Sequence, residues 1–208
     1  MDAFPQDFRN QLLDLMAWRR DVRHFRTDPV DEAVLMRCLS AFRLAPSVGL
    51  SEPWRIIRVQ SDAARRAAYE NYQTANADAL AGYTGEQAAA YSQLKLSGMA
   101  QAPEHLAIFC DDATTQGRGL GAASMPEMRR HSVVGAITLM WLTARAEGLG
   151  MGWVSILDPA QLTRDLDVPS GWSLVAYLCV GWPAAHSDTP ELERTGWEHR
   201  HDLKIDSR

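Results

Sequence analysis

The segment from about residue 125 to residue 147 constrains the fold of this chain more than any other, because it predicts a long helix with almost no polar face. A helix that is apolar around most of its circumference is buried, either inside a domain or at a subunit interface. Ser124 directly before it is a typical N-cap residue. The apolar surface consists of Val133, Val134, Ala136, Ile137, Leu139, Met140, Trp141 and Ala144.

Helices and strands mix along the chain without a regular βαβ repeat, which predicts an α+β sandwich. With 208 residues, the chain is long enough for a single domain, residues 1–208, with a substantial core. Short apolar runs predict strands at residues 55–59, 105–110, 151–157 and 173–182. Helical spacing predicts further helices near residues 8–16, 31–42 and 61–101, the last one broken near Gly82 and Gly85, and a short helix after Asp158-Pro159.

The composition is that of a soluble globular protein, with 46% hydrophobic and 23% charged residues. A net charge of −5 argues against nucleic acid as the main partner. No run of about 18 apolar residues exists and the N-terminus lacks the blocks of a signal peptide, so we expect no membrane partner. Three scattered cysteines without a CxxC pair predict buried free thiols, no metal site and a cytoplasmic location.

Residues 19–25, Arg-Arg-Asp-Val-Arg-His-Phe, follow the first predicted helix and place three guanidinium groups within five residues. A guanidinium is always charged and offers paired donors that match phosphate oxygens, so we predict a clamp for a phosphorylated ligand. Asp21 weakens such a clamp, and is tolerated when it pairs with a neighbouring arginine or takes part in chemistry. The alternative is a solvated charge run with internal salt bridges.

Two other segments have distinct compositions. Residues 69–101 contain four tyrosines on predicted helices, and we interpret them as a lid-like excursion over the site. Residues 183–208 are too polar to fold alone, which predicts an arm that wraps a neighbouring subunit. No G-x-G-x-x-G and no Walker motif occurs, so no dinucleotide site is indicated.

These motifs together resemble the flavin-dependent nitroreductase superfamily. The resemblance lies in residues 19–25, the loop from Ala45-Pro46-Ser47 to Pro53-Trp54, the run Gly150-Met151-Gly152-Trp153 and the terminal Arg200. It extends over nearly the whole chain and implies a nitroreductase-like sandwich with a central mixed, mostly antiparallel sheet flanked by helices. It also implies a homodimer with a swapped C-terminal arm and two FMN sites at the subunit interface.

Two departures from the usual pattern narrow the resemblance to one branch. Asp21 stands where typical members have serine, and Leu50-Ser51-Glu52 replaces an Asn-x-Gln before the Pro-Trp pair. These features, with the run from Gly152 to Pro159, resemble the branch that makes 5,6-dimethylbenzimidazole, the lower ligand of vitamin B12. Such enzymes use O2 to fragment reduced FMN into dimethylbenzimidazole and erythrose 4-phosphate, so FMN is a consumed substrate. A separate flavin reductase is the expected source of reduced FMN.

The resemblance implies that Asp21 and Ser155 are catalytic, with Asp21 as a proton shuttle and Ser155 as a donor to the flavin. The implied flavin contacts are Arg19, Arg20, Asp21, Val22, Arg23, Ser47, Gly49, Leu50, Leu96, Trp153, Val154, Ser155 and Arg200. Simpler interpretations stay open at several of these positions. They are an Asp21–Arg23 ion pair, a strand hydroxyl bonded to the backbone at Ser155, a core role for Trp153 and a solvated charge at Arg200. Gly152 suggests close approach of a ligand.

Two other functions remain open at this point. One is a conventional nitroreductase or quinone reductase that cycles FMN with NAD(P)H, which the negative charges of Asp21 and Glu52 disfavour. The other is a flavin-binding protein without catalysis, which would return oxidised FMN intact.

Overall fold

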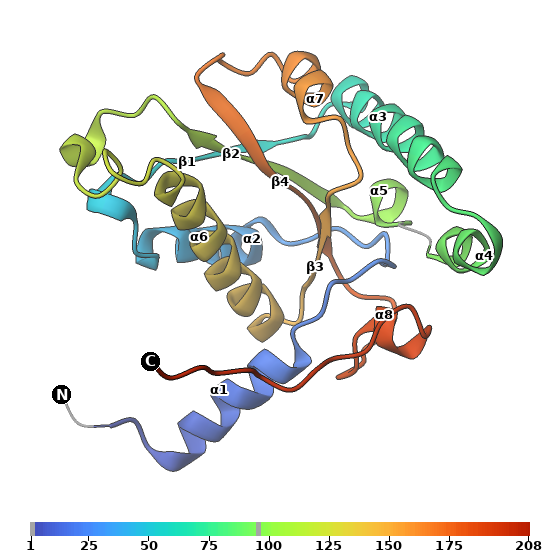
Figure 1. Ribbon diagram of the computed structural model, residues 1–208, viewed down its shortest axis with the longest axis horizontal. Helices are drawn as coiled ribbons and strands as arrows, with labels where there is room; N and C mark the ends of the chain where they lie inside the picture. Colours follow the sequence, from blue (N-terminus) through green and yellow to red (C-terminus); the bar gives the residue numbers. More distant parts are fainter. Residues whose placement is uncertain (1–2, 95–96) are drawn as a thin grey trace.

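The computed structural model describes residues 3–94 and 97–208, and its centre is a four-stranded sheet (Figure 1). The strands are β1 (Trp54–Arg58), β2 (Glu104–Asp111), β3 (Gly150–Val154) and β4 (Trp172–Gly181), in the order β1-β2-β4-β3. All three pairings are antiparallel. Among the described residues, the one parallel pairing is an isolated bridge between Asp21 and Met151. The prediction of an α+β sandwich with a mostly antiparallel sheet is confirmed. The parallel bridge between Asp21 and Met151 is the part of the described structure that makes the sheet mixed.

Helices lie on both faces of the sheet (Figure 1). One face carries α6 (Met128–Ala146) and α2 (Glu32–Ser40), and the other carries α3 (Asp62–Ala81) and α7 (Pro159–Asp165). The remaining helices are α1 (Gln6–Trp18), α4 (Gly85–Gln93), α5 (Gly98–Gln101) and α8 (Glu191–Arg194), with 3-10 turns η1 (Ala41–Leu44), η2 (Val48–Leu50) and η3 (Gln116–Gly119).

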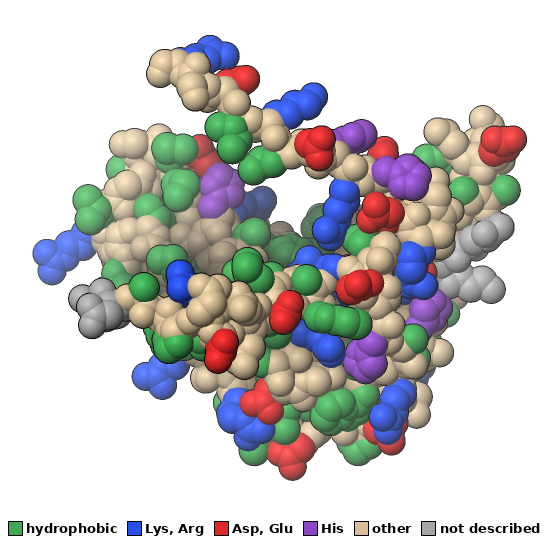
Figure 2. All heavy atoms as spheres, turned by 90° about the horizontal axis from the view of Figure 1, so that it is seen from below, with side chains coloured by type: hydrophobic (Ala, Val, Ile, Leu, Met, Phe, Trp, Pro, Cys, Tyr) green, Lys and Arg blue, Asp and Glu red, His purple; other side chains and the backbone are tan. Residues whose placement is uncertain are grey.

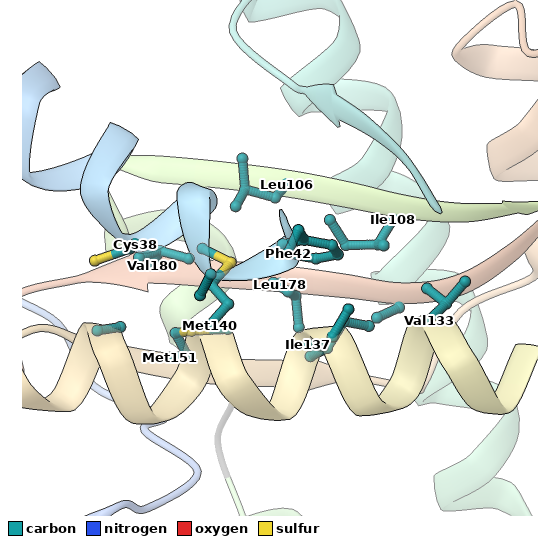
Figure 3. Close-up of a cluster of buried hydrophobic side chains, with 14 of the residues drawn as sticks. Cys38, Phe42, Leu106, Ile108, Val133, Ile137, Met140, Met151, Leu178 and Val180 are labelled. Carbon is teal, nitrogen blue, oxygen red and sulfur yellow. The ribbon is translucent and has the colours of Figure 1, made fainter. Parts of the chain in front are cut away.

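The larger part of the core lies between α6 and the sheet (Figure 3). Val133, Ile137 and Met140 point from α6 toward strand residues such as Ile108 and Leu178, and all five are fully buried. Neighbouring strand positions point to the opposite face, as the pleat requires, and pack under α3 and α7. The sequence predicted that this helix is buried around most of its circumference. In the structure of the single chain, the side that faces the sheet is buried.

Two predicted boundaries are wrong. The long helix begins at Met128 and not after Ser124, because the Met125 N–H donates to the Gly121 carbonyl and residues 126 and 127 form a turn. The third strand ends at Val154, opposite Tyr177, so residues 155–157 lie outside the sheet.

Other parts of the structure leave apolar side chains exposed. Helix α1 contributes no buried residue, and its Phe8 and Leu13 are 45% and 65% exposed. Val134 on the outer side of α6 is 40% exposed. Residues 198–208 are all exposed and, beyond α8, form an arch that stands off the body of the molecule (Figure 2).

The cysteine prediction is confirmed, since Cys38, Cys110 and Cys179 are buried and free. Within residues 3–94 and 97–208, no group of three or more His, Cys, Asp or Glu side chains is arranged to hold a metal ion. None of the helices described there has the length and apolarity needed to cross a membrane.

Candidate active site

The arginine segment, residues 19–25, begins where α1 ends and crosses the edge strand β3. The Val22 N–H donates to the Met151 carbonyl oxygen at 2.9 Å. This close approach requires a glycine at position 152, because a Cβ atom there would lie 2.2 Å from the Val22 carbonyl oxygen. The sequence suggested that Gly152 admits a ligand, and this interpretation is corrected here: Gly152 admits the backbone of the arginine segment.

Asp21 lies where this segment meets the end of β3. Its Oδ1 accepts a hydrogen bond from the Trp153 backbone N–H at 2.8 Å, and its Oδ2 lies 3.7 Å from Arg23 Nε. Although 41% of the side chain is exposed, the surrounding protein desolvates the carboxylate and raises the pKa of Asp21. That effect outweighs the Trp153 hydrogen bond and the charges of Arg23 and Arg19, which act in the opposite direction. The simpler interpretation of Asp21 as an ion-pair partner of Arg23 is therefore incomplete, because the hydrogen bond from the Trp153 N–H is the stronger of its two contacts.

Four arginines converge beside Asp21 on a cavity of about 140 Å³, here called the arginine cavity. Its lining consists of Arg19, Arg20, Asp21, Arg23, Pro190, Glu191, Leu192 and Arg200. Figure 2 shows basic side chains in the hollow of the face seen there. The structure thus brings Arg200, from the C-terminal arm, together with the arginines that follow α1.

The arginine cavity contains donors that lack acceptors. Arg20 Nε and Arg23 Nη1 are buried and have no hydrogen-bond partner among the described residues. Burial and the nearby charges of Arg200 and Arg19 lower the pKa of Arg20. Unpaired buried donors beside like charges are costly, and an anion such as phosphate is the kind of group that offsets this cost. The residues present therefore fit the phosphate end of FMN.

Helix α8 supplies part of the cavity that the sequence did not predict. Pro190, Glu191 and Leu192 come from a polar stretch in which no motif pointed to a site. Arg20 also donates from Nη2 to the Asp188 carbonyl oxygen, which ties the arginine segment to this stretch. The Pro-Glu pair that starts α8 was the available signal, since proline followed by an acidic first turn is typical of a helix N-terminus.

The three predicted residues at the end of β3 point in different directions. The Trp153 ring packs near the Trp141 ring of α6, with centroids 6.3 Å apart, so its side chain joins the core while its N–H holds Asp21. Val154 is buried and lines a small recess next to Asp21. Ser155 is exposed and makes no hydrogen bond to the described residues, so the interpretation as a strand hydroxyl bonded to the backbone is wrong.

Ser47, Gly49 and Leu50 do not line the arginine cavity. Ser47 Oγ accepts from the Glu52 N–H at 3.0 Å, and Leu50 is 72% exposed. Gly49 has φ +59°, and a Cβ there would lie 2.8 Å from the Leu120 carbonyl oxygen, so η2 packs tightly on the loop after β2. Glu52 accepts from Gln116 in that same loop.

The two groups of predicted residues lie at opposite ends of α6. The Val48 N–H donates to Ser132 Oγ in the first turns of α6, whereas the Arg19 guanidinium lies 5.0 Å from the Trp141 ring centroid, further along the helix. Ser132 and Trp141 are two and a half turns apart, or about 14 Å along the axis. The two groups therefore do not share the arginine cavity within one chain, and Glu52, beside Gln116, is not among its lining residues either. The predicted contact Leu96 lies outside the described residues.

A family comparison decides what kind of protein this architecture belongs to. A model of the nitroreductase family matches residues 16–182, most of the chain. The chain belongs to the nitroreductase family. The resemblance inferred from the motifs is thereby confirmed.

Two relatives within the nitroreductase family are close along their whole length. A protein of Rhodospirillum rubrum named 5,6-dimethylbenzimidazole synthase is 54% identical over 197 residues, which covers 95% of this chain and 93% of that protein. One of the same name from Rhodobacter capsulatus is 50% identical, with 94% of each chain covered. Among solved structures, iodotyrosine deiodinase bound to FMN and 3-iodo-L-tyrosine is 19% identical with a TM-score of 0.76, covering 95% of this chain and 98% of that one. At that identity, the likeness concerns the fold alone.

Proposed function

We propose that this nitroreductase-family protein is a 5,6-dimethylbenzimidazole synthase, which fragments reduced FMN with O2 into 5,6-dimethylbenzimidazole and erythrose 4-phosphate. The proposal is carried by the identity of more than half of its residues with the Rhodospirillum rubrum synthase over nearly the full length of both. The geometry of Asp21 supports it, since a carboxylate beside the flavin suits proton transfer and does not help a reductase gather electron density.

In this proposal the arginine cavity binds the phosphate of FMN. Arg19, Arg20 and Arg200 supply the positive charge, and the unpaired donors of Arg20 and Arg23 gain acceptors. Arg23 lines the cavity next to Asp21, so it can hold the part of the ligand that leads from the phosphate to the ring. Reduced FMN supplies the electrons and the carbon skeleton that O2 attacks.

Asp21 acts as the proton shuttle in this proposal. The Trp153 N–H fixes Oδ1, while Oδ2, which lies 3.7 Å from Arg23 Nε, accepts no hydrogen bond from the described residues and can take or give a proton. Desolvation raises the pKa of Asp21 above its ordinary value, which favours a group that must change its protonation state during turnover. Ser155 acts as a donor to the ligand in this proposal, which is supported by its exposed position just beyond β3 and by the lack of a hydrogen bond from its hydroxyl to the described residues.

The proposed site is completed by a second copy of the chain. Ser47, Gly49 and Leu50 do not line the arginine cavity of their own chain, and we expect them to contact the flavin held by the partner. The exposed apolar side chains of α1 and α6 and the exposed end of the arm, residues 198–208, supply surface for this homodimer. Residues 69–101 serve as the lid, and a separate flavin reductase supplies reduced FMN.

The test is to mix reduced FMN with the protein without oxygen, admit air and identify all products by chromatography and mass spectrometry. We expect flavin absorbance to disappear as dimethylbenzimidazole and erythrose 4-phosphate form. Intact oxidised FMN as the sole product would refute the synthase, and rapid NADH oxidation with a nitroaromatic would favour a conventional nitroreductase.

Asp21→Asn tests the proposed shuttle. The amide keeps an oxygen for the Trp153 N–H but cannot exchange a proton, so FMN should bind while product falls by about 10²- to 10⁴-fold. Asp28→Asn is the matched control, because Asp28 pairs only with Arg26 at the surface, with 52% of its side chain exposed. Full synthase activity of Asp21→Asn would show that Asp21 does not carry the proton.

A further inference from the structure

Three aromatic rings join α4 to the C-terminal arm. The rings of Tyr83 and Tyr91, at the two ends of α4, stack with centroids 4.9 Å apart. Trp197 of the arm meets both, with centroid distances of 5.8 Å to Tyr83 and 6.3 Å to Tyr91. The three side chains are partly buried, and no role in the proposed reaction accounts for them.

Helix α4 depends on this ring cluster for its position. It is nine residues long and, among its described side chains, has no buried one. A helix of this length is marginal in water without tertiary contacts. Its side-chain hydrogen bond to α3 runs from Tyr91 Oη to Asn76 Oδ1 at 2.9 Å, and Tyr91 itself belongs to the ring cluster.

Trp197 connects the ring cluster with the arginine cavity through α8. Its backbone N–H donates to the Leu192 carbonyl oxygen at 2.8 Å, and Leu192 lines the cavity. Arg200, three residues further on, lines the same cavity. Arg20 holds the other end of this stretch through the Asp188 carbonyl oxygen. Residues 188–200 therefore touch the cavity at both ends and carry Trp197 between them.

We propose that Trp197 is a positioning residue that seats α4 over the site when a phosphate group occupies the arginine cavity. This inference rests on the proposed function, because it takes the phosphate of FMN as the natural occupant. Without an anion, Arg20 and Arg200 repel each other and residues 188–200 are loosely held. An anion draws both guanidiniums inward, orders the stretch and presses Trp197 against Tyr83 and Tyr91.

The same link operates in reverse, because binding free energies between two sites are reciprocal. If phosphate favours the seated position of α4 by a given factor, then seating of α4 favours phosphate binding by the same factor, and loss of the Trp197 ring should remove that gain in affinity. If Trp197 only fills space, its removal should lower the free energy of unfolding, but it should change neither the effect of phosphate on α4 nor the affinity for phosphate.

The experiment measures amide hydrogen exchange in residues 85–93 with and without inorganic phosphate, in the whole protein. In the wild type we expect phosphate to slow this exchange about three- to tenfold. In Trp197→Ala the exchange should be fast and insensitive to phosphate, with phosphate affinity lowered by a similar factor. Trp197→Phe keeps a ring at this position and should restore most of both effects.

Two further variants make the result decisive. Tyr83→Leu removes the same ring contact from the α4 side, so it should reproduce Trp197→Ala even if that variant folds poorly. Arg200→Gln should abolish the effect of phosphate on α4 while leaving the rings in place. The inference would be overturned if phosphate slowed amide exchange in α4 of Trp197→Ala or Tyr83→Leu as much as it does in the wild type.

Phosphate is not consumed, so this test does not depend on whether FMN is fragmented. If the protein makes dimethylbenzimidazole but phosphate does not slow exchange in α4, only the role of Trp197 is refuted. If phosphate slows exchange in α4 but the protein returns FMN intact, the proposed function is refuted and the role of Trp197 stands. With FMN as ligand, Trp197→Ala should shift the outcome of oxygenation from dimethylbenzimidazole toward intact oxidised flavin by about threefold or more, because a loosely seated α4 admits water.

Discussion

Gly152→Ala is the substitution with the most sharply defined consequence in this structure. The added Cβ would lie 2.2 Å from the Val22 carbonyl oxygen, a distance that real Cβ contacts do not reach. The atom it meets is backbone, so it cannot rotate away as the end of a side chain would. Either β3 or the arginine segment must move, and the hydrogen bond from Val22 N–H to Met151 is then lost or strained.

The cost follows from those two contributions. Overpacking a tight site costs roughly 1–3 kcal/mol, and a backbone hydrogen bond contributes about 0.5–1.5 kcal/mol. We therefore expect Gly152→Ala to lower the free energy of unfolding by about 2–4 kcal/mol, which for a chain of this size is a fall in Tm of roughly 5–15 °C. The same displacement separates Asp21 from the Trp153 N–H, so FMN binding and product formation should also fall.

Thermal unfolding followed by circular dichroism, at one fixed protein concentration, measures this cost. Gly82→Ala is the matched control, because Gly82 caps α3 with φ −78° and its Cβ would lie 3.3 Å from one carbonyl oxygen. We expect the control to remain within about 0.5 kcal/mol of the wild type. Equal unfolding curves for the two variants would show that the arginine segment does not pack on β3 as described.

Three predictions concern the buried side chains of β2 and β4. Burial lowers the pKa of His105 to about 4, so the folded state keeps this imidazole neutral while the unfolded state takes up a proton first. Stability should therefore fall by about 3 kcal/mol as the pH drops from 7 toward 4, measured by urea unfolding at several pH values. Tyr177→Phe removes the 2.8 Å contact with His105 Nδ1 and should cost about 1–3 kcal/mol by the same assay. Leu178→Ala opens a cavity at a fully buried position and should cost about 2–5 kcal/mol, against little change for Leu44→Ala, since Leu44 is 81% exposed.

The sequence was most informative where a local pattern carries its own physical cause. Asp158 accepts from the N–H groups of Ala160 and Gln161 and starts α7, as the Asp-Pro pair predicted. The four strands appear where apolar runs predicted them, because burial on both faces leaves little room for polar residues.

Its errors arose where a distant segment decides the local structure. Ser155 was assigned to a strand, but the ladder ends at the Val154–Tyr177 pair. Beyond it, Asn71 of α3 exchanges two hydrogen bonds with the Asp158 backbone and draws the chain away from the sheet. No pattern within residues 151–157 carries that information.

The candidate site shows the same division. The arginines that line the cavity were predicted from the sequence, because paired guanidinium donors match phosphate oxygens. The contribution of α8 was not, since it depends on how the arm folds back over the cavity.

The position of Asp21 also explains how an acidic side chain persists among arginines. A carboxylate surrounded by guanidiniums alone would be fully ionised, with a lowered pKa, and would serve only to neutralise them. Here the Gly152 contact brings the segment so close to β3 that the Trp153 N–H donates to one oxygen of Asp21 and the surrounding protein desolvates the carboxylate. The arginines line the cavity, and the carboxylate keeps a raised pKa. In the proposed function, one glycine in β3 therefore lets a segment of seven residues both bind an anion and hold a group that exchanges a proton.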